Sequence, residues 1–258
     1  MLLSCVFTGF YNQVRAGCNS TIEVDKCYMQ ESMSSALMLV NPCYFRMVES
    51  NLIRTQVNSG VNIRWLSDST DKHISRVIEI KQNDFGQNYY CGVEIQGNVY
   101  SAHNIKMDIS KNCIYRNKKE GLLIQNLAVT AILLYGNEFS KNEGDNLKLA
   151  HVHNKVNRSY DFRLENCQVE YSKGGFGANF YDTSFVIKNC IVKGNQNGGI
   201  FCGCPEKPAR LVEDALIFLK KFPMSLKISN CEVTQNMHYG VLIQDFWKGS
   251  VIIKHTLV

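Results

Sequence analysis

The chain has 258 residues, of which 45% are hydrophobic and 20% charged, with only 4 prolines, a composition typical of one ordered domain rather than of a disordered segment. The formal net charge is +5 and the basic residues are scattered along the chain, which argues against a nucleic-acid surface. No apolar run reaches the length of a membrane span, and the apolar opening lacks the basic flank and cleavage site of a signal peptide. We therefore expect residues 1–258 to form a single domain with no nucleic-acid or membrane partner.

The chain carries a repeat from its first residues onward. Residues 3–7 resemble the middle of one copy, complete copies follow, and the two clearest occupy 185–202 and 226–243. Each copy begins with a strand of alternating apolar residues, followed by an Asn or Cys and a short apolar stretch. A polar anchor residue comes next, then in most copies a glycine, and then a second apolar strand. The anchors, in chain order, are Ser32, Gln56, Asn88, Asn117, Asn142, Ser172, Asn195 and Asn236.

The columns of this register predict how the copies pack. Five residues before the anchors stand only Asn and Cys: Cys27, Asn51, Asn83, Asn112, Asn137, Cys167, Cys190 and Cys231. Apolar residues alternate with polar ones on both sides of the anchor, as in short strands with one buried face. Such strands bury their faces by stacking as coils about 4.8 Å apart, so the column becomes a ladder of hydrogen-bonded Asn amides and small buried thiols. We predict an all-β, right-handed parallel β-helix of about eight coils.

One segment breaks the period between the last two anchors. Within residues 203–223, Pro208 can begin a helix. Its apolar face would be formed, at helical spacing, by Leu211, Ala215, Phe218, Leu219 and Phe222. We predict a helical insertion between coils, whose apolar face either lies on the solenoid wall or docks a partner chain.

Cysteine and histidine usage indicates a reducing compartment and no metal site. The 11 cysteines are an odd number, and several fall in the buried ladder column, so we expect free thiols and a cytoplasmic location. The spacing of Cys202 and Cys204 does not suit zinc. His151 and His153 lie two residues apart at one strand edge, and the register places no further ligand beside them. We expect no metal and no other cofactor.

The wording of the repeat resembles a known group of proteins. The residues that carry the resemblance in the last copy are Ile228, Asn230, Cys231, Val233, Asn236, Gly240, Val241 and Ile243. They resemble the carbohydrate-binding and sugar-hydrolase-like β-helix repeats, and most of all the β-helix regions of eukaryotic F-box proteins and of spindle-associated SHC-binding proteins. The resemblance implies a β-helix that recognises proteins. The paired aspartates near a Gly-His-Gly that mark the pectinase branch are missing, and so is an F-box.

The outward positions of the strand after each glycine carry few carboxylates. Six residues after the anchors stand Met38, Asn62, Glu94, Leu123, Lys148, Ala178, Phe201 and Leu242. Acid–base chemistry on a polysaccharide needs converging acidic or basic groups, whereas Arg64 and Glu94 on neighbouring coils are expected to form only a surface ion pair. We therefore predict a non-enzymatic scaffold that binds a protein partner through Met38, Leu123, Phe201 and Leu242, the loops and the helical insertion. The alternative is a carbohydrate-active enzyme or carbohydrate-binding β-helix of the pectinase-like class.

The two ends of the chain resemble incomplete coils. Solenoids need polar caps over their terminal coils, and neither end shows one. We expect the sequence to be a segment of a longer chain or a member of an assembly that covers its ends.

Overall fold

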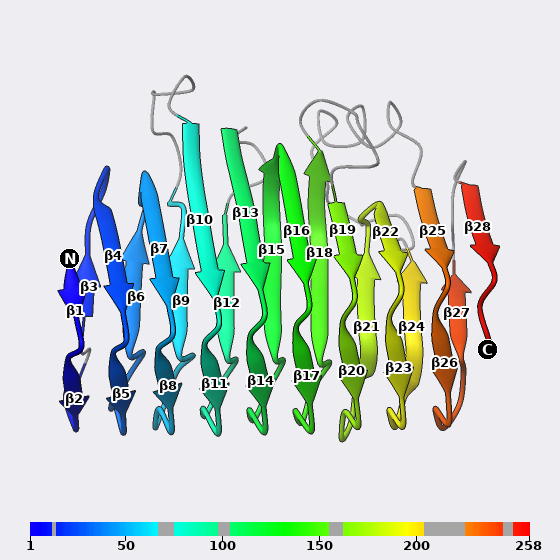
Figure 1. Cartoon of the computed structure of the whole chain (residues 1–258), viewed down its shortest axis with the longest axis horizontal. Helices are drawn as coiled ribbons and strands as arrows, with labels where there is room; N and C mark the ends of the chain where they lie inside the picture. The colour runs from blue at the N-terminus through cyan, green and yellow to red at the C-terminus, as the bar shows by residue number, and fades with distance from the viewer. Residues whose placement is uncertain (12–13, 67–74, 98–103, 155–161, 204–224, 245–249) are drawn as a thin grey trace, which may run out of the picture.

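The computed structural model describes residues 1–11, 14–66, 75–97, 104–154, 162–203, 225–244 and 250–258. These ranges contain 28 strands and no helix. Each coil gives one strand to each of three parallel sheets, and successive coils stack side by side along the long axis of the molecule (Figure 1). The prediction of a parallel β-helix is confirmed.

The three sheets are named A, B and C in the order in which a coil passes through them. Sheet A contains β1 (Leu2–Leu3), β4 (Thr21–Asp25), β7 (Tyr44–Val48), β10 (Ser75–Lys81), β13 (Asn104–Ser110), β16 (Ala131–Tyr135), β19 (Phe162–Glu165), β22 (Phe185–Lys188), β25 (Ser225–Ser229) and β28 (Ser250–Lys254). Sheet B contains β2 (Val6–Thr8), β5 (Tyr28–Gln30), β8 (Asn51–Ile53), β11 (Asp84–Gly86), β14 (Cys113–Tyr115), β17 (Glu138–Ser140), β20 (Gln168–Glu170), β23 (Ile191–Lys193) and β26 (Glu232–Thr234). Sheet C contains β3 (Val14–Ala16), β6 (Leu37–Val40), β9 (Val61–Arg64), β12 (Val93–Gln96), β15 (Leu122–Val129), β18 (Leu147–Asn154), β21 (Phe176–Tyr181), β24 (Gly198–Gly203) and β27 (Val241–Gln244).

Alternation along each strand separates the core from the surface. In β10, Ile78 and Ile80 are buried inside the coil, whereas Glu79 and Lys81 point outward. A single residue in the left-handed region then turns the chain from sheet A into sheet B, for example Gln82 with φ 58°. This conformation costs a non-glycine residue roughly 1–2 kcal/mol, so the turn needs support from its surroundings.

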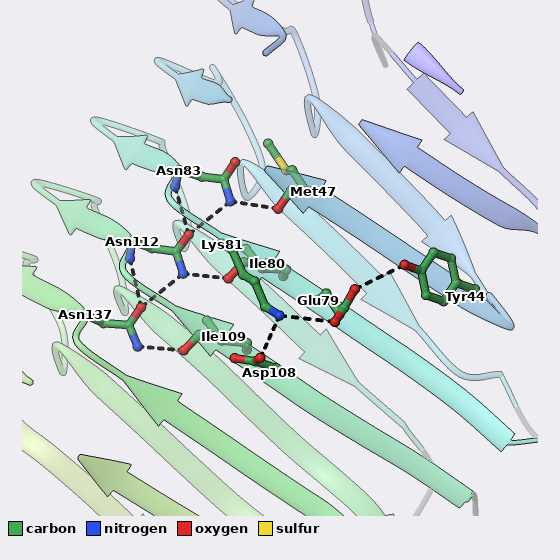
Figure 2. Close-up of polar contacts among 10 residues, drawn as sticks. All are labelled: Tyr44, Met47, Glu79, Ile80, Lys81, Asn83, Asp108, Ile109, Asn112 and Asn137. Carbon is green, nitrogen blue, oxygen red and sulfur yellow. Dashed lines mark hydrogen bonds and ion pairs between the residues drawn. The ribbon is translucent and has the colours of Figure 1, made fainter. Parts of the chain in front are cut away.

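The support comes from a ladder of asparagines (Figure 2). The Nδ2 of Asn83 donates to Oδ1 of Asn112 at 3.0 Å, and the Nδ2 of Asn112 donates to Oδ1 of Asn137 at 3.0 Å. The same oxygens accept the backbone N–H of the preceding rung, each at 3.0 Å. The second Nδ2 hydrogen of each amide goes to a backbone carbonyl in the coil before, at 2.7 to 3.1 Å. All three side chains are buried, which confirms the predicted ladder at these rungs.

A second ladder at the anchor position explains the glycines. Asn88, Asn117 and Asn142 are buried and bonded amide to amide, at 3.0 and 2.9 Å. A Cβ on Gly92 would lie 2.9 Å from Nδ2 of Asn117, and one on Gly121 would lie 2.6 Å from Nδ2 of Asn142. Glycine is therefore required wherever the next coil places an asparagine in the ladder.

The predicted register is one residue wrong in the second coil. Ser50, not Asn51, is the buried rung: its Oγ accepts from the backbone N–H of Cys27 at 3.0 Å, and its own N–H donates to the next asparagine in the ladder at 2.9 Å. Thr55, not Gln56, is likewise the buried anchor, and Gln56 is exposed. The turn that follows has one additional residue, so a fixed spacing counted back from the glycine shifts the assignment by one.

The sixth coil also departs from the predicted register. Ala178 pairs with Leu147, and Asn179 pairs with Lys148. The extra residue before β21 therefore puts Ala178, which was predicted to face outward, in the core together with Phe180, and puts Asn179 on the outer face.

Cysteines occupy four of the five rungs that lack asparagine, and Ser50 occupies the other. Cys27, Cys167, Cys190 and Cys231 are buried as predicted, and the thiol of Cys190 donates to backbone carbonyl oxygens at 3.2 and 3.4 Å. Ten of the 11 cysteines lie in the described part of the chain, and all ten are free thiols.

The predicted helix over 203–223 falls almost entirely on residues outside the described ranges. Its apolar face, Leu211, Ala215, Phe218, Leu219 and Phe222, therefore has no structural description. A membrane-crossing helix is not found anywhere in the ranges that the structure describes.

The outer face of sheet A carries a charged network (Figure 2). Lys81 lies 2.8 Å from Asp108 and 3.1 Å from Glu79, whose other carboxylate oxygen accepts from the hydroxyl of Tyr44 at 3.1 Å. The hydrogen bond that Lys81 donates to Asp108 is the main reason that the pKa of Lys81 is raised. These groups are partly solvated, so the network contributes little to stability and offers no reactive group.

Candidate functional site

The outer face of sheet C carries the polar groups that could act on a ligand. Each of its strands begins at the turn that follows sheet B. His151 lies in the second half of β18, and Asp182 directly follows β21. Two groups of side chains lie on it. We call the carboxylates Glu94, Glu120 and Asp145 the acidic stripe, and His151, His153, Tyr181 and Asp182 the histidine cluster.

Glu94 is the most tightly held carboxylate of the acidic stripe. It is only 4% exposed, and its Oε2 accepts from the hydroxyl of Ser59 and from Nδ2 of Asn62, both at 2.8 Å. The amide of Gln96 bonds the other oxygen. The pKa of Glu94 is raised, mainly because burial disfavours the charged carboxylate. The hydrogen bonds from Ser59 and Gln96 lower it only in part. Glu94 does not form the surface ion pair with Arg64 that the sequence predicts, because Arg64 Nε donates instead to Oδ1 of Asn62 at 2.9 Å.

Asp145 and Glu120 complete the acidic stripe on the next coils. Asp145 accepts from the backbone N–H of Phe176 at 2.6 Å and from Nδ2 of Asn179 at 2.8 Å, and burial raises its pKa. Glu120 lies between Glu94 and Asp145 in coil order, 3.7 Å from the ammonium of Lys148. Glu94 and Asp145 are occupied by hydrogen bonds and nearly inaccessible, so they position the strands and leave Lys148 as the reachable charged group.

The sequence predicts few carboxylates at the outward positions after the glycines, and Glu94 is the only one there, but this face also carries Glu120 and Asp145. Glu120 and Asp145 were missed because they precede the glycine column by one residue, at Gly121 and Asn146, and only later positions of the strand were considered. The signal that could have found them is the pair of acids at the same offset on consecutive coils.

The histidine cluster stands at a corner of sheet C. Asn126, His151 and Asp182 occupy equivalent places on three consecutive coils and all adopt left-handed backbone angles, with φ 56°, 53° and 51°. This conformation is uncommon outside glycine, and asparagine, aspartate and histidine adopt it more readily than most residues. Nδ1 of His151 lies 3.1 Å from Oδ2 of Asp182.

The rest of the cluster surrounds this pair. Nε2 of His153 lies 3.6 Å from the same carboxylate oxygen, and the ring of Tyr181 meets that of His151 edge-on with centroids 5.2 Å apart. The Asp182 side chain is 4% exposed, whereas that of His151 is 34% exposed. Burial lowers the pKa of His153, opposed by the charge of Asp182. A half-exposed imidazole oriented by a buried carboxylate is the arrangement of a general base.

The register therefore does bring partners to His151 and His153, contrary to the sequence analysis. The partner is Asp182, which lies one coil further along. Among the described residues no group of three His, Cys, Asp or Glu side chains has the arrangement of a metal site.

The apolar residues predicted to bind a partner do not form an exposed surface. Leu123 is 5% exposed and belongs to the buried set, while Met38, Phe201 and Leu242 are half-buried. Phe201 packs against Phe176 with ring centroids 5.1 Å apart. These side chains cover sheet C rather than project from it.

The fold and its repeat define a class of parallel β-solenoids in which each coil adds one strand to each of three sheets. The sequence matches the family described as right handed beta helix region over residues 73–205, just over half of the chain. The chain therefore belongs to the right-handed β-helix family. No curated protein matches it.

Solved structures with a similar fold include those of an enzyme named periplasmic alginate epimerase AlgG. A single-substitution variant of that enzyme aligns with a TM-score of 0.51 and 15% identity, over 97% of this chain and 47% of that chain. The unsubstituted enzyme aligns with a TM-score of 0.47 and 13% identity, over 99% of this chain and 49% of that chain. The chain thus spans about half the length of the structures that it matches, and at this identity the likeness shows the fold alone.

Two predictions are corrected by these comparisons. The sequence predicts a protein that is not an enzyme, whereas the solved structures that share the fold belong to a carbohydrate-active enzyme. It also expects a cytoplasmic location, whereas the matched enzyme is described as periplasmic. Neither the exclusion of catalysis nor the cytoplasmic assignment is retained.

Proposed function

We propose that the outer face of sheet C binds an acidic polysaccharide and that the histidine cluster removes a proton from one of its uronate residues. The observation that carries the proposal is the contact between Asp182 and the half-exposed His151 of β18, 3.1 Å long. Its chemical class, a carbohydrate-active β-helix, is the alternative predicted from the sequence, and the alginate epimerases that share the fold support it.

The geometry suits abstraction of a proton next to a carboxylate. Asp182 fixes the Nδ1 side of the imidazole, so Nε2 of His151 is the nitrogen that can accept the proton. The carboxylate beside the reacting carbon has to be neutralised by a cation, and the partly exposed Lys148 lies on β18 three residues before His151. Tyr181, in contact with His151, carries a hydroxyl that can return a proton.

Hydrolysis by a pair of carboxyl groups is less well supported. Glu94 and Asp145 have raised pKa values, as an acid catalyst needs, but both are buried and accept hydrogen bonds from neighbouring residues. The narrower resemblance to F-box and SHC-binding proteins, and a protein partner, stay predictions.

The test is exchange of the proton beside the carboxylate. The full chain would be incubated with alginate and with polygalacturonate in D2O, and deuterium incorporation followed by NMR, with binding measured by affinity electrophoresis against neutral dextran. We expect retention on the polyuronates alone, exchange that is lost in His151→Ala, and weaker retention in Lys148→Gln. His238→Ala, which removes an exposed imidazole elsewhere, is the control.

Absence of both retention and exchange would overturn the proposal. Exchange that persists in His151→Ala would remove this residue as the base. Retention without exchange would reduce the proposal to carbohydrate binding.

A further inference from the structure

The turns between sheets B and C form a continuous edge, at the bottom of the view in Figure 1. The coils stack here through the backbone: the N–H of Met33 donates to the carbonyl of Phe10 at 2.9 Å, and that of Tyr89 to Thr55 at 3.0 Å. On the next coil, the N–H of Lys118 donates to the carbonyl of Asn88 at 2.9 Å. Side chains at the tips of these turns therefore form one row across neighbouring coils, which we call the turn edge.

The first coils give the turn edge an apolar half. Its large side chains are each more than half exposed: Phe10 58%, Tyr11 70%, Met33 52%, Val57 55% and Tyr89 58%. Isolated exposed apolar residues need no explanation, but a contiguous set does. None of these side chains is used by the core or by the face of sheet C.

The following coils give it a basic half. Arg116, Lys119, Lys141 and Lys173 are exposed at these turns, and no ion pair to them occurs among the described residues. The fifth cation, Lys118, lies 2.7 Å from Glu143. The other two acids of these turns belong to the acidic stripe: Glu120 lies 3.7 Å from Lys148, and Asp145 is buried. Towards the apolar half, Glu31 is likewise paired, with Arg54 at 3.5 Å. The turn edge therefore has a net positive charge beside a row of apolar tips.

We propose that the turn edge docks the protein onto a bilayer surface that contains anionic lipids. Apolar and aromatic side chains that lie beside lysines and arginines are the combination that binds a membrane interface, because insertion and headgroup attraction add. The apolar side chains of the row are each more than half exposed, so they project into solvent rather than line a groove for a peptide. A second copy of the same edge would bring like charges together.

This placement leaves the candidate site accessible. Strand β18 begins at the turn edge and runs away from it to His151. A protein held at the lipid surface by the turn edge would therefore present the histidine cluster on its far side. The sequence analysis expects no membrane contact because no spanning segment exists, but peripheral binding requires none.

Co-sedimentation with vesicles tests the proposal. Vesicles of phosphatidylcholine alone would be compared with vesicles that also contain about 30% phosphatidylglycerol. We expect binding to the anionic vesicles only, weakened by salt. Removal of two lysines by Lys119→Gln and Lys173→Gln should lower the partition coefficient roughly 25-fold, since each basic residue contributes about fivefold. Met33→Ser with Tyr89→Ser should also lower it at least several-fold.

The matched controls are Tyr135→Ser and Lys188→Gln, exposed residues on the outer face of sheet A. Their binding should equal that of the unaltered protein. Failure to sediment with anionic vesicles, or equal loss in the control variants, would overturn the proposal. Binding to both vesicle types that is insensitive to the edge variants would also overturn it, as would a dimer in light scattering that Tyr89→Ser disperses. A far-UV strand spectrum for every variant excludes unfolding as the cause.

Discussion

The Nδ2 of Asn146 donates to Oδ1 of Asn195, 49 residues and two coils further along the chain, at 3.0 Å. Between them the ladder rung is Ser172, whose side chain is too short to continue the amide series. The Oδ1 of Asn146 accepts from Asn142 at 2.8 Å, so its amide takes the place that an asparagine at 172 would fill. Asn146 can occupy a glycine column because the following coil leaves this space.

This pairing predicts a non-additive double substitution. Asn146→Gly should cost about 1–3 kcal/mol, because Asn142 and Asn195 each lose a buried partner. Ser172→Asn alone should destabilise by collision with the side chain of Asn146. The double variant recreates the arrangement of Gly92 with Asn117 and should be more stable than either single variant. Urea unfolding of the four proteins gives the coupling energy. Additive losses would show that the two positions do not share one space.

The asparagine ladder itself makes a second prediction. Asn137→Leu should cost roughly 1–3 kcal/mol, because it leaves the amide of Asn112 and the backbone of the preceding coil without buried partners. Gln168→Leu, on the exposed outer face of sheet B, is the control and should change the urea midpoint little. An equal effect at both positions would mean that the ladder adds nothing beyond ordinary surface interactions.

The repeat predicts the fold because its columns are set by contacts between equivalent positions. Asn112 and Gly121 can each be assigned from sequence, since one must bond its neighbour and the other must make room for it. Single-residue slips cannot be assigned in this way, because Ser50 and Asn51 are both polar and either can cap the turn. The contact of His151 with Asp182 was missed for a related reason. It depends on the extra residue before β21, which shifts Asp182 into the place next to His151.

Glu94 predicts a pH dependence of stability with a defined sign. Its folded-state pKa is raised, so the unfolded chain releases the proton first, and stability falls as the pH rises from about 4.3 through the folded-state pKa. Glu94→Gln should remove this fall. The urea midpoint of the unaltered protein, relative to that of the variant, should therefore decrease between pH 4 and pH 7.

The opposite sign is expected for Glu143, and this gives an internal control. A hydrogen bond from Lys118 lowers its pKa, so its contribution appears as the pH rises and is lost in acid. Glu143→Gln should therefore make the relative midpoint of the unaltered protein increase with pH, by a small amount because both groups are largely solvated. The same slope for both variants would show that burial of Glu94 does not control its titration.

The thiols should separate into accessible and protected sets. Cys18 is exposed and should react first with Ellman reagent, whereas Cys167, Cys190 and Cys231 are buried in the ladder. The hydrogen bond with Cys167 raises the pKa of Cys190 to about 12, which suppresses the thiolate that reacts. In denaturant all 11 thiols should react. A lower number without reductant would show disulfides.

His153 provides a direct measurement of the electrostatics of the histidine cluster. Burial lowers its pKa below that of the unfolded chain, about 6.5, so the folded protein keeps the imidazole neutral and loses stability as the pH falls below that value. The charge of Asp182 opposes this effect, and Asp182→Asn should lower the pKa of His153 further. The measurement is an NMR titration of the imidazole Hε1 signal, assigned by its loss in His153→Gln and repeated in urea as the reference. A pKa of His153 at or above the value in urea would contradict the account. A rise in the pKa of His153 in the Asp182→Asn variant would also contradict it, because the carboxylate would then not be the group that favours the protonated ring.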